Sequence, residues 1–251
     1  MADYRKTPPM ESENMIAGRN AVRELLKSGK PIDKLYILKG AKDGLLSVIL
    51  AEANRAGVPV AERDRAALDR MAVANQGVIA QIPERAYASL DDIIALARER
   101  NEAPFVVIAD CINDPHNLGA IIRSAECAGC HGVIIPKRHS ALLTPAAVKA
   151  SAGAVEHIPV CKVSNLSMAI EFLKENGLWI YALEADGVPY DGLDYKGGCA
   201  LVLGSEGEGV SRLVRENSDF VVSIPMRGKV NSLNVSNAAA VVLFEVAKGR
   251  R

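Results

Sequence analysis

The chain has 251 residues, 49% of them hydrophobic and 24% charged, and its 30 basic residues balance its 30 acidic ones. This length can bury a large core in one or two domains, and the zero net charge does not announce a nucleic-acid ligand, although a local basic surface is enough to bind one. No apolar run reaches the roughly 18 residues of a membrane span. The five cysteines, without a secretion signal, indicate a cytoplasmic protein with reduced thiols.

The first third of the chain predicts a flexible tail followed by a small α/β domain. Residues 1–13 are polar and include two adjacent prolines, so we expect no fixed structure there. Within 14–83, helical spacing alternates with short apolar runs. The predicted helices are 21–29, 43–57 and 65–72, and the predicted strands are 34–40, 58–62 and 77–83. Residues 84–103 are mostly charged and predict a linker that runs into a helix.

Residues 104–251 repeat this alternation on a larger scale. The predicted strands are FVVIAD (105–110), HGVIIP, IPVCKV, LWIYAL, CALVLG and FVVSIP, and the predicted helices are 117–129, 144–151, 165–176 and one from about 234. Such alternation is typical of a mainly parallel sheet with helices on both faces. Ligands of open α/β sheets bind at the carboxyl ends of the strands, so the loops there are the expected site.

The segment Cys127-Ala128-Gly129-Cys130-His131 matches the C-x-x-C-H motif that attaches c-type haem. No export signal accompanies it, and there is no second cysteine pair to complete a zinc site. We therefore expect no metal, and we expect both cysteines to be buried as small apolar residues.

The first loop of interest is DCINDPHNLGAIIRSAECAG (110–129). Asp114 and the proline after it predict a turn, and Asn117 is a candidate cap for the next helix. Gly119 is expected to leave the backbone open one helical turn before Arg123. The plain alternative is a well-capped helix that carries an ordinary surface arginine.

Two further loops follow predicted strands. In LGSEGEGVS (203–211), three glycines permit tight turns, Ser211 is a candidate cap, and Glu206 and Glu208 would repel a phosphate. In SIPMRGKVNSLNVSNAAAVVLFEVAK (223–248), Asn231, Ser232 and Asn234 exceed the single cap that a helix needs.

These loops lack the common signatures of nucleotide and hydrolase sites. They contain no P-loop lysine, no G-x-G-x-x-G and no G-x-S-x-G. A cationic sulfonium cofactor with ribose hydroxyls and an adenine suits glycine-rich backbone beside carboxylates, although composition alone does not name it.

The stretches NDPHNLGAIIRSA, LGSEGEGVS and IPMRGKVNSLNVSNAAAV resemble the three motifs of the SpoU/TrmH family of RNA ribose 2′-O-methyltransferases. Residues 16–83 resemble the small substrate-binding domain, similar to ribosomal protein L30e, of the RlmB branch, which methylates a guanosine ribose of 23S rRNA. This resemblance implies a SPOUT-type parallel sheet with a C-terminal trefoil knot, and a homodimer formed through the knotted domain. One departure is Asn75-Gln76-Gly77, where relatives often have His-Gln-Gly.

The resemblance also implies a cofactor, S-adenosylmethionine, and a set of site residues. The residues expected around its adenosine are Leu203, Gly204, Ile224, Met226 and Leu233. Arg123 is expected near the 2′-hydroxyl, with Asn117, Glu206, Ser232 and Asn234 orienting it, the ribose and the cofactor. Because a guanidinium keeps its proton at neutral pH, Arg123 either positions the hydroxyl and its phosphate, or a closed dry site lowers its pKa.

RNA is the expected macromolecular partner, and neither DNA nor a membrane is expected. The candidate RNA contacts are Arg19, Arg23, Lys137, Arg138, Arg227 and Lys229, and binding through them should weaken with salt. Two alternatives stay open: a tRNA ribose 2′-O-methyltransferase, and a non-catalytic RNA-binding or assembly protein on the same fold. The complete set of motif residues argues against the second.

Overall fold

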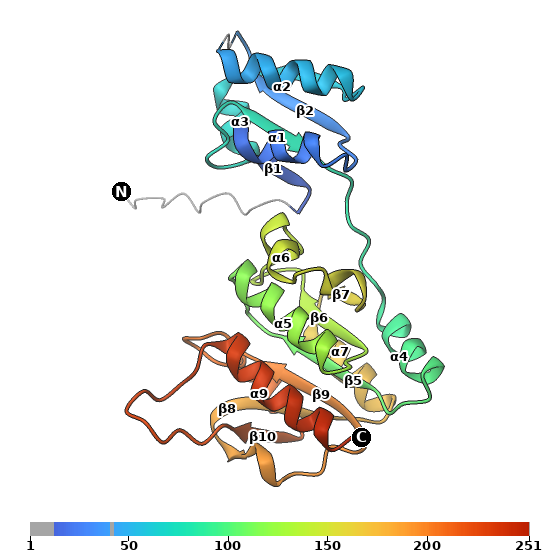
Figure 1. The fold of residues 1–251 in the computed structure, drawn as a ribbon. Helices are drawn as coiled ribbons and strands as arrows, with labels where there is room; N and C mark the ends of the chain where they lie inside the picture. Colours follow the sequence, from blue (N-terminus) through green and yellow to red (C-terminus); the bar gives the residue numbers. More distant parts are fainter. Residues whose placement is uncertain (1–12, 41–42, 251) are drawn as a thin grey trace. The chain divides into compact units, whose positions relative to one another are not determined.

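A computed structural model describes residues 13–40 and 43–250, and the chain divides into two compact units after Arg85 (Figure 1). Except for Glu13, the predicted flexible tail lies outside the described residues. Within the described ranges, no helix has the length and apolar character needed to cross a membrane.

The first unit is an α/β domain, as the sequence predicts. Its strands lie in the order β1-β4-β2-β3, with β2 and β3 parallel and β4 antiparallel to β1 and β2. Helices α1 and α2 bury Val22, Leu25, Leu46 and Ile49 in one apolar core. The elements are β1 (Met15–Ala17), α1 (Arg19–Lys27), β2 (Lys34–Leu38), α2 (Gly44–Arg55), β3 (Val60–Arg63), α3 (Arg65–Met71) and β4 (Val78–Gln81).

The second unit contains a parallel sheet in the order β10-β8-β9-β5-β6-β7, which confirms the predicted strand direction. The strands are β5 (Phe105–Ala109), β6 (Gly132–Pro136), β7 (Val160–Val163), β8 (Leu178–Pro189), β9 (Gly198–Leu203) and β10 (Phe220–Ser223). Because all of them run the same way, the loops after β5, β8, β9 and β10 lie at one edge of the sheet.

Helices cover both faces of this sheet. The helices are α4 (Leu90–Glu99), α5 (Pro115–Cys127), α6 (Pro145–Ala150), α7 (Leu166–Glu175), α8 (Arg212–Glu216) and α9 (Val235–Lys248). Residues of α5, α6 and α9 share one core with Phe105 and Val107 of β5, whereas residues of α4, α7 and α8 share the other with Val106 and Ile108. This division follows from the alternation of side chains along a strand.

Residues 84–103, predicted as a linker that runs into a helix, do contain a helix, α4, and it belongs to the second unit. Its residues Ile93, Ile94 and Ala97 are buried in the core of the second unit. A capping box between Ser89 and Asp92 fixes its first turn. The charged residues that suggested a linker lie on its solvent face, so the apolar spacing was the better guide.

The expectation that Gly119 leaves backbone open is wrong. Gly119 is buried, and a Cβ there would overlap the carbonyl oxygen of Ala147 and the side chain of Ala150, both in α6. The glycine therefore allows α5 and α6 to pack closely and is not available to a ligand.

Arg250 ties the end of the chain to the segments that precede β5 and β9. Its guanidinium lies over the ring of Phe105, 5.0 Å from the centroid. It donates hydrogen bonds to main-chain carbonyl oxygens of Ala103 (2.8 Å), Pro104 (3.2 Å), Tyr195 (3.2 Å) and Gly197. These bonds hold the C-terminal end of α9 against the sheet.

We expect Arg250→Ala to lower the free energy of unfolding by about 2–3 kcal/mol, because partly buried carbonyl oxygens would lose a charged donor. The control is Arg212→Ala, which removes an exposed i,i+4 ion pair with Glu216 and should cost less than about 0.5 kcal/mol. Urea denaturation of both variants measures the difference. Equal stability of the two would contradict this role for Arg250.

Candidate active site

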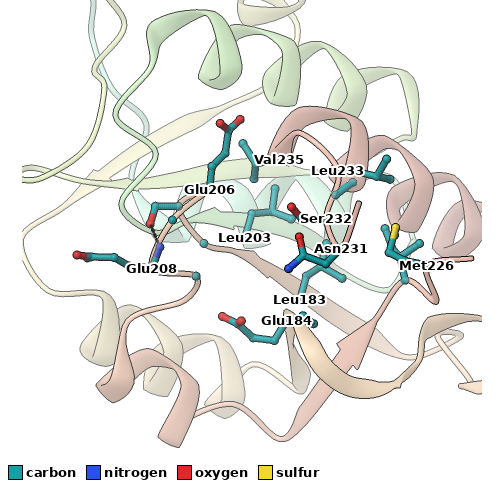
Figure 2. Close-up of a pocket in the computed structure, with 17 residues that line it drawn as sticks. Leu183, Glu184, Leu203, Glu206, Glu208, Met226, Asn231, Ser232, Leu233 and Val235 are labelled. Carbon is teal, nitrogen blue, oxygen red and sulfur yellow. Dashed lines mark hydrogen bonds between the residues drawn. The ribbon is translucent and has the colours of Figure 1, made fainter. Parts of the chain in front are cut away.

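A cavity of about 390 Å³ opens at the carboxyl edge of the larger sheet (Figure 2). Its walls are residues 183–185 of β8, the loops after β9 and β10 and the start of α9. The volume lies in the range of small-molecule sites. It is lined by all of the residues predicted to surround an adenosine, namely Leu203, Gly204, Ile224, Met226 and Leu233.

The cavity is acidic at one end and apolar at the other. Figure 2 shows the carboxylates of Glu184, Glu206 and Glu208 on one side, with Met226 and Leu233 on the other. Among the described residues that line it, there is no lysine or arginine. Three carboxylates in a lining without basic residues favour a cation over a phosphate, and the apolar end suits an aromatic base.

Sequence reasoning missed Glu184. It lies near the middle of β8 (Leu178–Pro189), which extends beyond the predicted strand end at residue 183. The signal that could have found it is the start of a polar stretch after LWIYAL, because strand ends of a parallel sheet carry ligand-binding side chains.

A polar cluster beside the cavity joins the three predicted loops. The amide nitrogens of Asn117 and Asn234 both donate to Oε1 of Glu206, at 3.1 and 2.6 Å. The same nitrogen of Asn234 lies 3.0 Å from Oδ1 of Asn117. In the sequence, Asn234 lies 117 positions from Asn117 and 28 positions from Glu206, so only the fold brings these side chains together.

Asn234 has two functions at once. Its Oδ1 accepts hydrogen bonds from the backbone N–H groups of Ser236 (3.0 Å) and Asn237 (3.4 Å), which caps α9, while its amide nitrogen serves the cluster. Asn231 and Ser232 are not needed for the cap, and both line the cavity instead. The surplus of polar residues before α9 therefore marks the site.

Asn117 is not the cap of its helix. That position belongs to Asp114, whose side chain accepts a hydrogen bond of 2.9 Å from the N–H of His116, and Pro115 begins the helix. Asn117 lies within the first turn, and its side chain is free to contact Glu206. Ser211, the other candidate cap, does occupy the N-cap position of α8, but its side chain makes no capping hydrogen bond.

Arg123 is the one predicted catalytic residue that the structure places away from this group. It is exposed on α5 and does not line the cavity. Six residues of helix separate it from Asn117, which corresponds to about 9 Å along the axis and about 240° around it. Of the five predicted catalytic residues, Asn117, Glu206 and Asn234 are thus joined by hydrogen bonds, and Ser232 lines the same cavity as Glu206.

The C-x-x-C-H segment differs in part from expectation. Cys130 is buried, but Cys127 is exposed. The ring of His131 is fully buried: Nδ1 accepts a hydrogen bond of 3.0 Å from the N–H of Phe105, and Nε2 lies 3.0 Å from Glu102. Burial lowers the pKa of His131 despite the nearby carboxylate. Both ring nitrogens are therefore used in structural contacts.

Comparison with known families and relatives agrees with this site. The sequence matches the SpoU rRNA Methylase family over residues 104–244, and the RNA 2′-O ribose methyltransferase substrate binding family over residues 15–88. YacO of Bacillus subtilis, named for the TrmH family of tRNA/rRNA methyltransferases, is 42% identical over 96% of this chain and 97% of its own. A Staphylococcus aureus protein named for the same family is 43% identical over 95% of this chain and 97% of its own.

The chain is also similar in fold to solved structures that are named as RNA-modifying enzymes. The rRNA methyltransferase of Sinorhizobium meliloti, crystallised with AdoMet, is similar with a TM-score of 0.61 and 27% identity, over 94% of this chain and 87% of its own. The TrmH/SpoU tRNA modifying enzyme of A. aeolicus is similar with a TM-score of 0.53 and 27% identity, over 64% of this chain and 83% of its own.

The fold and the site together define an RNA ribose 2′-O-methyltransferase that uses S-adenosylmethionine as methyl donor. More narrowly, the chain belongs to the SpoU/TrmH family and has the SPOUT-type α/β fold, with a substrate-binding domain before the methyltransferase domain. The cofactor fits the residues present, because the cavity offers apolar walls, glycine backbone and carboxylates for a cation.

Proposed function

We propose that this protein methylates the ribose 2′-hydroxyl of a guanosine in 23S rRNA. The observation that carries the choice of rRNA is the presence of both domains. The S. meliloti rRNA methyltransferase aligns with 94% of the chain, whereas the A. aeolicus tRNA modifying enzyme aligns with 64%. A separate substrate-binding domain at residues 15–88 suits a large structured RNA.

The cavity supports a division of roles among the predicted residues. Leu203, Gly204, Ile224, Met226 and Leu233 would hold the adenosine part of S-adenosylmethionine. When bound, this cofactor supplies a methyl group activated by a positively charged sulfur. The carboxylate of Glu206, oriented by Asn117 and Asn234, and the nearby Ser232 would align the ribose, and alignment alone can supply up to roughly 7–11 kcal/mol of a reaction barrier.

Arg123 is proposed to hold the RNA next to the reacting hydroxyl. A guanidinium binds a phosphate through two parallel hydrogen bonds and stays protonated at neutral pH. The exposed position of Arg123 supports a positioning role toward RNA, in which the proton of the hydroxyl leaves to water.

A homodimer through the methyltransferase domain and a C-terminal trefoil knot are part of the same proposal. The exposed apolar side chains on α9 support the dimer, since Val241 and Phe244 are 38% and 48% exposed. The family resemblance alone supports the knot. A cytoplasmic location follows from the proposed RNA substrate.

The candidate RNA contacts differ in whether they already form ion pairs within the chain. Arg19 is paired with Asp43 at 2.6 Å, and Arg23 is 3.4 Å from Glu52. The remaining candidates are exposed after β6 and β10, at the same edge of the sheet as the cavity: Lys137, Arg138, Arg227 and Lys229. These four are the better candidates for phosphate contacts near the site.

The test is methyl transfer from tritiated S-adenosylmethionine to separate pools of unmodified 23S rRNA and tRNA, followed by mapping of the labelled ribose. We expect label in a guanosine of 23S rRNA, formed about 100-fold more slowly or slower still with Arg123→Ala. Label in tRNA alone would overturn the proposed substrate and establish the alternative enzyme. An absence of label in both pools, with cofactor still bound, would overturn naked 23S rRNA as the substrate and favour either an assembled ribosomal particle or the non-catalytic RNA-binding alternative.

A further inference from the structure

The loop that carries Glu206 is closed on itself. Residues 204–209 leave β9, and Ser205 and Gly209 exchange a pair of backbone hydrogen bonds, each 3.0 Å long. Gly204 lies directly against the backbone of Gly209 and Val210, where a Cβ would overlap. The loop therefore forms a compact lobe at the wall of the cavity, with Glu206 at its end.

Two carboxylates hold the base of this lobe from opposite sides. The N–H of Val210 donates to Glu184, and the N–H of Ser211 donates to Asp110 at 2.7 Å. The N–H of Asp110 in turn donates to the carbonyl oxygen of Leu203 at 2.8 Å, so Asp110 is bonded to both ends of the loop.

The sheet explains why these two carboxylates meet the same loop. Strand β9 lies between β8 and β5, and Leu203 is paired with Leu183 on one side and Ala109 on the other. The next residue along each neighbouring strand is Glu184 or Asp110. The side chains of Glu184 and Asp110 therefore lie on opposite sides of the C-terminal end of β9.

Packing and burial show that both contacts are specific. Gly209 adopts a φ of +71°, and a Cβ at that position would lie within 2.7 Å of both carboxylate oxygens of Glu184. Asp110 is only 3% exposed, and its other oxygen is 3.4 Å from Sγ of Cys111. A buried carboxylate must accept hydrogen bonds, and the loop amide supplies one.

We propose that Glu184 and Asp110 are positioning residues that clamp loop 204–209, and thereby place Glu206 against Asn117 and Asn234 and shape the cofactor cavity. The inference rests on the proposed function only in that the cavity holds S-adenosylmethionine. Charge-assisted hydrogen bonds to backbone amides are among the stronger ones, so the clamp is able to keep a glycine-rich loop in one conformation.

The experiment compares Glu184→Ala, Glu184→Gln and Asp186→Ala. Glutamine keeps an acceptor oxygen for the Val210 amide. Asp186 is the matched control, because it lies two positions further along β8, pairs with Arg215 at 2.7 Å and is outside the cavity. The measurements are hydrogen exchange of the amides of 205–211 in the free protein, the Kd for S-adenosylmethionine, and the separate effects on KM and kcat.

We expect Glu184→Ala to speed exchange of the loop amides and to raise the Kd by about tenfold, the effect of one charge-assisted hydrogen bond. The KM for the cofactor should rise with the Kd, and the thermal midpoint should match that of Asp186→Ala. Glu184→Gln should keep the slow exchange of the loop amides, because the acceptor oxygen remains, while the loss of its charge at the cavity should raise the Kd by about threefold. Asp110→Asn should likewise keep the slow exchange.

Unchanged exchange and Kd in Glu184→Ala would overturn the clamp, as would a Glu184→Gln variant as weak as the alanine variant. Because exchange is measured without RNA, the result is independent of which RNA is methylated. A protein that binds the cofactor but labels neither RNA pool would defeat the proposed substrate and leave the clamp intact.

Discussion

Replacing Arg123 by alanine should lower kcat for RNA methylation by about 100-fold or more, the lower range for loss of a group acting on proton transfer or alignment. The Kd for S-adenosylmethionine should stay within about twofold, because Arg123 does not line the cavity. Arg123→Lys should also be impaired, since lysine keeps the charge but not the forked donor geometry.

Single-turnover methylation and calorimetric titration of the cofactor separate these two effects. The control is Arg212→Ala, which removes another exposed arginine of the same unit, one that pairs with Glu216. Near-full activity of Arg123→Lys would show that charge alone is sufficient. A parallel loss of cofactor affinity in Arg123→Ala would contradict a role confined to the RNA.

Introducing a methyl group at Gly204 should disrupt the cavity itself. In Gly204→Ala, the new Cβ would overlap the backbone of Gly209 and Val210, which has no flexible end that could move aside. We expect the Kd for S-adenosylmethionine to rise by about 10- to 100-fold, which corresponds to the 1–3 kcal/mol typical of overpacking.

Titration of the cofactor into Gly204→Ala measures this effect, with Gly192→Ala as the control. Gly192 lies in the same unit, outside the cavity, and no atom lies within 4 Å of a Cβ built there. Equal affinities in the two variants would mean that the loop relaxes without cost. A large loss of thermal stability in Gly204→Ala would instead assign the glycine to folding.

The helix predicted at the end of residues 84–103 is present as α4, but its high density of charge did not indicate that Ile93, Ile94 and Ala97 pack into the core of the second unit. For α5, Asn117 and Asp114 are both good cap residues, and the proline after Asp114 is the local signal that marks Asp114 as the cap. The partner of the Asn117 side chain has no local signal, because Glu206 lies 89 positions away in the chain.

The sequence by itself determined the two-part division and the parallel α/β class of the second unit, and its resemblance to the SpoU/TrmH motifs pointed to five of the residues that line the cavity. These are readable because alternating apolar periodicity and strand-end loops are local patterns, and because the three motifs are contiguous stretches. Long-range contacts leave no such local pattern. Only the tertiary structure decided that Gly119 is covered by α6, that Arg123 lies apart from the cluster, and that Glu184 and Asp110 flank β9, because strand order brings together residues that the chain keeps far apart.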